Sequence, residues 1–358
     1  MIYIDEIIMN LKSYLNLAGY SVVHGIVDLS CAAIVFGTLL FHGTNVHDVF
    51  IFVIVYNLLA FALQAPFGLL VDKFQVAKES ALIGCLILLS AFFFFDTPAL
   101  VVILSGLGNA FFHVWGWSIS LNFSPQKATA PGIFVAPGAL WLAIGILIWK
   151  GGWFVAWPFI VLLVASCVFI ILSKIPNINY KTEYIKPKVK YFELVILLLL
   201  LSVSIRSLYG LAAAWKADVT LLFILTSAIV LGKALWGIVW DKFGWTRTAI
   251  VALVISAPLL AFFPSVPALA ILWAFLFQMT MPITLTALSN MLPWRSATAF
   301  GLTVLALIIG ILPTYIWAKW FLGNKRIILT IVFISAISLL VSFRFLNNYF
   351  KDKLKINL

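Results

Sequence analysis

The sequence predicts an all-α membrane protein with twelve transmembrane helices in two pseudo-symmetric six-helix bundles. Three observations support this prediction: the composition, twelve apolar runs of membrane-spanning length, and one internal repeat. Of the 358 residues, 64% are hydrophobic and 10% are charged, and the mean hydropathy is +1.14. A soluble domain needs a largely polar surface, so most of this chain is expected to be solvated by lipid.

The apolar runs have the length that a membrane requires, since a helix needs roughly 20 residues to cross about 30 Å of hydrocarbon. They lie at 17–40, 49–71, 79–95, 98–121, 131–149, 152–172, 192–212, 219–240, 247–263, 266–290, 297–318 and 327–346. A polar stretch divides them six and six. We therefore expect an N-terminal bundle at 1–172, a cytoplasmic linker at 173–191 and a C-terminal bundle at 192–358. The residues before the first run should form either a short amphipathic helix on the membrane surface or a frayed terminus.

The charge distribution indicates topology rather than a nucleic-acid partner. The net charge is +11, but the basic residues lie in short loops between apolar runs and not along one face. With a cytoplasmic N-terminus, sixteen Lys and Arg residues lie on the cytoplasmic side and five on the other, as the positive-inside rule requires. We expect a multi-pass inner-membrane protein with both termini in the cytoplasm.

An internal repeat relates the two predicted halves. The segment GLLVDKF at 68–74 recurs as GIVWDKF at 237–243, which is an offset of 169 residues. The same offset relates ATAPG at 128–132 to ATAFG at 297–301, and Asn109 to Gln278. Three registrations at one spacing indicate a duplicated six-helix unit, which is typical of transporters that bind their substrate between two halves.

The G-x-x-x-D-K pattern after the second span, repeated after the eighth, resembles the loop signature of the major facilitator superfamily, and the twelve-span layout covers the whole chain. The resemblance implies inter-helix contacts that latch the cytoplasmic side. The expected gating residues are Gly68, Asp72, Lys73, Gly237, Asp241, Lys242 and Arg247. The first copy departs from the pattern, because Gln75 follows Phe74 where the signature has glycine. The segment GNAFFH at 108–113, with the Pro131-Gly132 helix start, is similar to the fosmidomycin-resistance-like branch.

His24 and Asp28 are the first candidate functional pair. An ionisable side chain in mid-membrane costs at least roughly 2.5–3.5 kcal/mol, so each one needs a partner, a water-filled cavity or a function. These two lie four residues apart in the first span and therefore on one helix face. A carboxylate beside an imidazole can bring proton uptake into the physiological range. We expect proton coupling here; the alternative is that Asp28 only holds a helix contact through His24 or Arg206.

Arg206 is the leading candidate for substrate binding. It lies near the middle of the seventh span and keeps its charge, so it must meet an anion, either Asp28 or a substrate carboxylate or phosphate. In the resembled fold the first, fourth, seventh and tenth spans line the cavity. The other candidates for substrate binding are Asn109, His113, Trp117, Tyr209, Gln278, Thr284, Gln64 and Lys233. For Asn109 and His113 the alternative is hydrogen bonding between helices, and for Lys233 it is an extension towards the cytoplasm.

Two candidate cations against one carboxylate favour an anionic or zwitterionic substrate. The sequence thus predicts a monomeric, proton-coupled secondary transporter that moves a small organic anion or zwitterion by alternating access, with export favoured by the branch resemblance. The alternative is a multidrug/proton antiporter for lipophilic cations at Asp28. A membrane-embedded metalloenzyme with His24, Asp28 and His113 as ligands is a distant alternative. We expect no enzyme activity, resident metal or cofactor.

Overall fold

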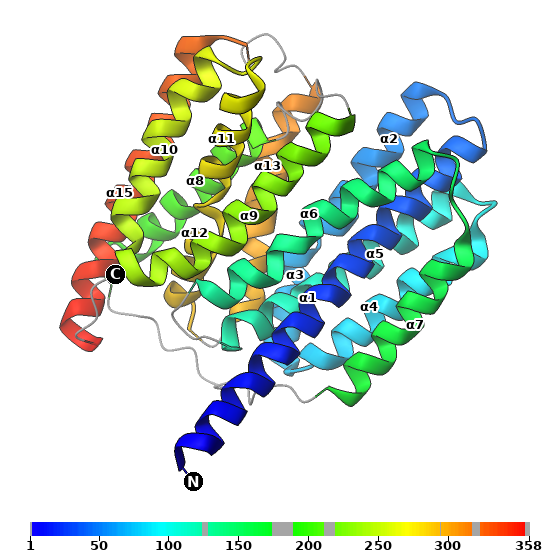
Figure 1. The fold of residues 1–358 in the computed structure, drawn as a ribbon, viewed down its shortest axis with the longest axis horizontal. Helices are drawn as coiled ribbons and strands as arrows, with labels where there is room; N and C mark the ends of the chain where they lie inside the picture. The colour runs from blue at the N-terminus through cyan, green and yellow to red at the C-terminus, as the bar shows by residue number, and fades with distance from the viewer. Residues whose placement is uncertain are drawn as a thin grey trace.

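The protein is a bundle of long helices (Figure 1). The computed structural model describes residues 2–123, 128–173, 189–210, 219–293, 295–316 and 323–354, and these contain helices and turns but no strand. Ten helices are long and apolar enough to cross a membrane, and the shorter apolar helices Ala156–Leu172 and Phe223–Leu235 provide two further spans. The prediction of an all-helical membrane protein with twelve spans is confirmed.

The first six spans form one group of packed helices. They are α1 (Ile2–Phe41), then α2 (Val46–Asn57) continuing through η1 (Leu58–Ala62) into α3 (Gln64–Phe74), then α4 (Ala77–Ala91) with η2 (Phe92–Phe94), α5 (Pro98–Phe123), α6 (Thr129–Lys150) and α7 (Ala156–Leu172). The first helix packs against α5, α6 and α7. It is one continuous helix from Ile2, so the prediction of a separate amphipathic helix or a frayed terminus before the first span is wrong for its described residues.

The last six spans form the second group. They are α8 (Phe192–Gly210), α9 (Val219–Phe243), α10 (Trp245–Phe262), then α11 (Pro267–Gln278) with α12 (Met281–Met291), α13 (Ser296–Ile316) and α15 (Lys325–Leu354). The helix α8 packs against α13 and α15, and α10 packs against α11 and α15. The N-terminus, the end of α7 and the end of α15 lie on one side of the molecule (Figure 1). We call this side the linker side.

Each group of helices has its own apolar core. One core lies within residues 17–170 except for four residues contributed by α12 and α13. The other lies within residues 189–346 except for Ala128. Two cores with few shared members are what two six-helix bundles require. The linker at 173–191 stays a prediction, because residues 174–188 lie outside the described part of the chain.

Two spans are interrupted next to a proline. The second span has a π-helical turn, Leu58–Ala62, just before Pro66. Proline has no N–H for the carbonyl four residues earlier, so the regular α-helical pattern is broken there. The tenth span breaks between Gln278 and Met281, where Pro282 occupies the first turn of α12. Pro282 thus coincides with a break between two helices.

The two bundles meet along two helix pairs, α3 with α13 and α6 with α9. These pairs are related by the repeat, because α3 and α9 carry the two G-x-x-x-D-K segments while α6 and α13 begin at the two A-T-A segments. The duplicated segments therefore lie where the bundles contact each other.

Candidate functional site

A buried carboxylate with two imidazoles forms the centre of the N-terminal bundle. Asp28 on α1 lies 3.2 Å from His24 (Oδ2 to Nε2) and 3.3 Å from His113 on α5 (Oδ1 to Nε2). Asn109, one turn before His113, donates its side-chain amide to Asp28 Oδ1 at 3.3 Å. All four residues are buried. The structure thus joins the predicted pair His24 and Asp28 to two residues that the sequence assigned to substrate binding.

The helix α6 closes this cluster from the other side. His24 places its Nδ1 2.8 Å from the carbonyl oxygen of Phe134 and stacks on the phenyl ring of that residue at 4.7 Å. One turn further along α6, a Cβ atom on Gly138 would overlap the carboxylate of Asp28 and the ring of His24. Only glycine leaves room for both side chains at this close approach.

Arg206 forms a second buried site in the C-terminal bundle. Its Nη1 donates to Thr280 Oγ1 at 2.7 Å, its Nη2 donates to Thr284 Oγ1 at 2.9 Å, and its Nε donates to the carbonyl of Ser202 at 3.2 Å. The guanidinium has five N–H groups, so two remain without a partner among the described residues. No described carboxylate pairs with Arg206, and the predicted contact with Asp28 is absent from this conformation.

The two threonines are oriented as acceptors for Arg206. Thr280 donates its own hydroxyl hydrogen to the carbonyl of Phe277 at 3.1 Å, and Thr284 donates to the carbonyl of Thr280 at 2.8 Å. Each hydroxyl has one hydrogen and donates it to a backbone carbonyl, so its lone pairs can accept hydrogen bonds from the guanidinium. The threonines hold the cation in place but leave its positive charge without a compensating negative charge.

Of four other predicted substrate residues, three are buried and one is half-buried. Lys233 on α9 is buried and its ammonium interacts electrostatically with Asp28 in the other bundle, so it does not extend towards water. Gln64 donates to the carbonyl of Ala60 at 2.6 Å, while its side-chain oxygen has no partner in the described residues. The hydroxyl of Tyr209 likewise has no described partner. Gln278 is half-buried at the end of α11.

Asp72 caps a helix of the opposite bundle. Its Oδ2 accepts hydrogen bonds from the backbone N–H and the hydroxyl of Thr298, both at 2.7 Å, and its Oδ1 accepts from the N–H of Ala297 at 3.2 Å. These donors belong to the first turn of α13, where unpaired N–H groups and the positive end of the helix dipole favour a carboxylate. The contact joins the two bundles on the linker side.

The backbones approach closely beside this cap. A Cβ atom on Gly68 would overlap the backbone of Ala297, and one on Gly301 would overlap the backbone of Gln64. Glycine at both positions therefore permits α3 and α13 to pack directly against each other. The same end of the interface includes Trp117, which stacks on Phe300 of the other bundle at 4.4 Å.

A direct polar contact also spans the bundles at this end of α5. The hydroxyls of Ser118 and Ser296 are 2.8 Å apart. Of the other predicted gating residues, Lys73 and Arg247 are exposed on the linker side. Gly237, Asp241 and Lys242 belong to α9, but their side chains lie outside the described part of the structure.

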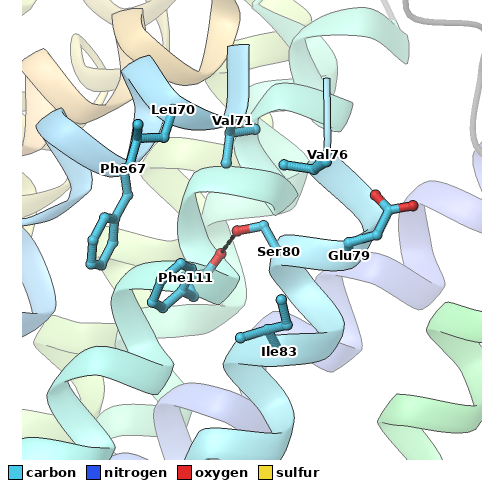
Figure 2. A pocket seen from close by; sticks show the side chains of 8 residues that line it. All are labelled: Phe67, Leu70, Val71, Val76, Glu79, Ser80, Ile83 and Phe111. Carbon is cyan, nitrogen blue, oxygen red and sulfur yellow. Dashed lines mark hydrogen bonds between the residues drawn. The ribbon is translucent and has the colours of Figure 1, made fainter. Parts of the chain in front are cut away.

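A small pocket lies elsewhere, between α3, α4 and α5. It has a volume of about 180 Å³ and is lined by Phe67, Leu70, Val71, Val76, Glu79, Ser80, Ile83 and Phe111 (Figure 2). Ser80 donates its hydroxyl hydrogen to the carbonyl of Phe111 at 2.8 Å, and Glu79 lies at the edge of the lining residues (Figure 2). The pocket contains none of the predicted substrate-binding residues, and its mostly apolar lining does not suit a polar ligand.

Sequence reasoning missed three residues that shape these sites. Gly138 had a signal, because the Pro137-Gly138 pair inside an apolar run marks a place where a helix bends and another backbone or side chain comes close. Phe134 had none, since its contribution to His24 is a backbone carbonyl. The role of Thr298 as a hydrogen-bond donor to Asp72 depends on how the two bundles pack against each other, which the sequence does not specify.

No family model matches the chain, and no curated protein matches its sequence. Solved structures do match. The human organic anion transporter MFSD10 (TETRAN) superposes with a TM-score of 0.68 at 12% identity, over 92% of this chain and 99% of that one. A variant of the E. coli fucose:proton symporter FucP gives 0.58 at 12%, over 95% and 98%.

A further structure matches over the same extent of the chain. FucP in the outward conformation, described as a Major Facilitator Superfamily transporter, gives a TM-score of 0.58 at 13% identity, over 92% of this chain and 99% of that chain. Each match covers 92% or more of this chain and therefore includes parts of both bundles. The chain therefore has the fold of major facilitator superfamily transporters, as the loop signature implied.

Proposed function

We propose that this protein is a proton-coupled secondary transporter that moves a small organic anion or zwitterion by alternating access. The observation that carries the proposal is Arg206, a buried cation with two unused N–H groups and no carboxylate partner in the described residues. A charge in mid-membrane costs several kcal/mol unless it is compensated. An anionic substrate would supply that compensation during transport.

The guanidinium geometry favours an anionic group with two neighbouring oxygens. Its unused N–H groups can form the paired hydrogen bonds that carboxylates and phosphates accept, while the threonines fix the plane of the guanidinium. The structural neighbours give general support, because one is an organic anion transporter and the other a proton symporter. Proteins with one fold can transport many different substrates, so the substrate assignment rests on Arg206 and not on the structural neighbours.

The proton site is Asp28 with its imidazoles, which lie in the other bundle. Each carboxylate oxygen of Asp28 already faces one histidine, so a lipophilic cation would have to compete with the two rings for it. This arrangement favours the anion transporter over the multidrug antiporter. The protein would act as a monomer in the inner membrane with both termini in the cytoplasm, and export remains the direction that the fosmidomycin-resistance-like resemblance favours.

Alternating access would use the contact at Asp72. In this conformation the linker side is held closed by the helix cap and by the contact between Ser118 and Ser296. If the linker side is cytoplasmic, these contacts close the cytoplasmic side in the conformation described. Opening the linker side would break these contacts and give the sites access to the cytoplasm.

Substrate binding is tested by a thermal-shift screen of purified protein against carboxylates, organic phosphates and lipophilic cations such as tetraphenylphosphonium, at two pH values. We expect anions to stabilise the wild type and to lose their effect in Arg206→Gln. The matched control is Arg326→Gln, since Arg326 is exposed at the start of α15, and it should respond as the wild type does.

Two outcomes of this screen would refute the anion assignment. Stabilisation by anions that persists in Arg206→Gln would show that the guanidinium does not bind them. Stabilisation by tetraphenylphosphonium alone would support the multidrug alternative. Proton coupling is tested separately in proteoliposomes with an anion that the screen identifies: Asp28→Asn should abolish accumulation against a gradient while leaving the protein folded, and undiminished accumulation would refute the coupling role.

A further inference from the structure

Both imidazoles of the proton site present the same nitrogen to Asp28. The Nδ1 atoms lie 2.8 Å from the carbonyl of Phe134 for His24 and 2.9 Å from the carbonyl of Asn109 for His113. A carbonyl oxygen only accepts hydrogen bonds, so each Nδ1 must carry a hydrogen. In a neutral ring the remaining nitrogen, Nε2, then has only a lone pair.

These two Nε2 atoms face the two different oxygens of one carboxylate, at 3.2 Å for His24 and 3.3 Å for His113. A carboxylate oxygen and an unprotonated imidazole nitrogen are both acceptors, and two acceptors at this distance repel each other. Each contact is attractive only when a proton lies in it, on either the nitrogen or the oxygen. Because the two contacts use different oxygens, one proton cannot serve both.

We propose, building on the proton coupling described above, that the loaded site holds two protons, one in each contact between Asp28 and a histidine, and that the transport cycle exchanges both. His113 is then a member of the proton site and not of the substrate site. Its contact joins α5 to α1, whereas the contact of His24 lies within α1. Loss of the proton at His113 therefore weakens the packing between two helices.

Two protons also reverse the charge of the cluster. A carboxylate with two imidazolium rings carries +1, and the same three groups carry −1 after both protons leave. Lys233 of the other bundle interacts electrostatically with Asp28, so the loaded cluster repels it and the empty cluster attracts it. The exchange of a single proton would change the net charge of the cluster only between a charged and a neutral value, without reversing its sign. The two-proton exchange thus gives the bundles opposite interactions in the two states.

The other titratable groups that face Asp28 are few among the described residues. They are Cys31 on α1, Tyr56 on α2 and Lys233 on α9. The helix α6 faces the carboxylate with Gly138 and the ring of His24 with Phe134, and neither side chain titrates. Asn109 donates its side-chain amide to Asp28 and does not titrate. The proton count of the site is therefore set by Asp28, His24 and His113.

The test is a count of ring protons by nitrogen NMR on the full chain, which needs no substrate. The chain has four histidines, and the substitutions His42→Gln and His47→Gln leave only the two of the site. With ¹⁵N-labelled histidine, we expect both Nδ1 atoms to carry hydrogen at every pH. Both Nε2 atoms should exchange their protons within one pH range, coupled through the carboxylate that they share.

Two variants make the count falsifiable, with folding checked by monodisperse elution and helical circular dichroism. In His113→Gln the remaining ring of His24 should still exchange its Nε2 proton, which gives a count of one. In Asp28→Asn the two rings should no longer exchange their protons in the same pH range. Rings that behave in Asp28→Asn as they do with Asp28 present would overturn the proposal.

Three other results would also overturn it. The first is a ring whose Nδ1 lacks hydrogen. The second is one Nε2 that never exchanges a proton while the other does. The third is a shift of both Nε2 signals on addition of one equivalent of Zn²⁺ at the loading pH, because that shift would identify a metal site. A proton count other than two would refute this inference but would not change the result expected for Asp28→Asn in the accumulation assay. Failure of that assay with an intact count of two would refute the proposed transport function alone.

Discussion

The helix cap at Asp72 makes a quantitative prediction about which conformation the protein adopts. The change is Asp72→Asn, which keeps the size of the side chain and removes its charge. The single amide oxygen can accept from Thr298 as Oδ2 does now, but the amide NH₂ then faces the N–H of Ala297, and two donors meet. We expect the linker-side contact to weaken without loss of the fold.

The expected magnitude follows from the three hydrogen bonds. A hydrogen bond to a charged group is worth about 1.5–3 kcal/mol and a neutral one about 0.5–1.5 kcal/mol. One bond is lost and two become neutral, but Asp72 is only half-buried, so we expect a loss of about 2–4 kcal/mol. At 1.4 kcal/mol per tenfold change, the population ratio of the linker-side closed and open conformations should fall roughly 30-fold to 700-fold.

The assay is a distance measurement between spin labels at Phe74→Cys and Arg247→Cys. Both positions are exposed on the linker side and they belong to different bundles. The three native cysteines are buried and should label poorly. We expect a longer distance to gain population in Asp72→Asn. The matched control, Asp48→Asn, changes a half-buried carboxylate at the start of α2, far from the cap along the second span, and should leave the distribution unchanged.

A distance distribution in Asp72→Asn identical to that of the parent protein would refute the reasoning. So would an equal change in both variants, because it would show that the labels report a general effect of charge. Equal melting temperatures of the two variants are required for the comparison, since a destabilised bundle could also separate the labels.

Three further substitutions test the packing of the sites. Gly138→Ala should lower the melting temperature, because the new methyl group overlaps the proton site and overpacking costs about 1–3 kcal/mol; an unchanged value, like that expected for Gly323→Ala in open space, would contradict the close approach. Gly301→Ala should lengthen the linker-side label distance, because α3 and α13 can no longer touch; an unaltered distance would argue against this contact as the latch. Thr280→Val removes an acceptor of Arg206 and should lower the affinity for the stabilising anion at least fivefold. Thr286→Val should leave the affinity unchanged, because the hydroxyl of Thr286 bonds only within its own helix. Equal effects of the two substitutions would argue against the role of Thr280.

Hydropathy and the repeat were sufficient to predict the twelve spans, because lipid imposes a length on every apolar helix. The four-residue spacing was sufficient to place His24 beside Asp28 on one helix face. The repeat also identified the segments that meet between the bundles. Each of these features depends on local periodicity or on duplication, which a single sequence records directly.

Contacts between helices were harder to predict, since they depend on crossing angles and rotations that periodicity does not specify. His113 was assigned to the substrate because its own helix offers it Asn109 as a neighbour, but the packing of α5 against α1 directs its Nε2 at Asp28. Arg206 was expected to meet an anion, and in this conformation the break before α12 presents it with two threonines instead.

The start of the chain shows a different limitation. Residues 2–41 contain no proline, and Gly43, with a φ of 60°, comes only after them, so no helix breaker separates the amphipathic segment from the first span. One continuous helix is the result. For Lys233 the alternative to substrate binding was an extension towards the cytoplasm, but the side chain is buried and interacts electrostatically with Asp28.

The most direct test of the proposed transport function measures proton and solute movement together. Proteoliposomes with a pH gradient are incubated with a mixture of small carboxylates and organic phosphates, and the solutes inside are identified by mass spectrometry. We predict that at least one anion accumulates in a manner that requires the gradient, Asp28 and Arg206. Accumulation that is independent of the gradient, or that persists in Arg206→Gln, would contradict the account.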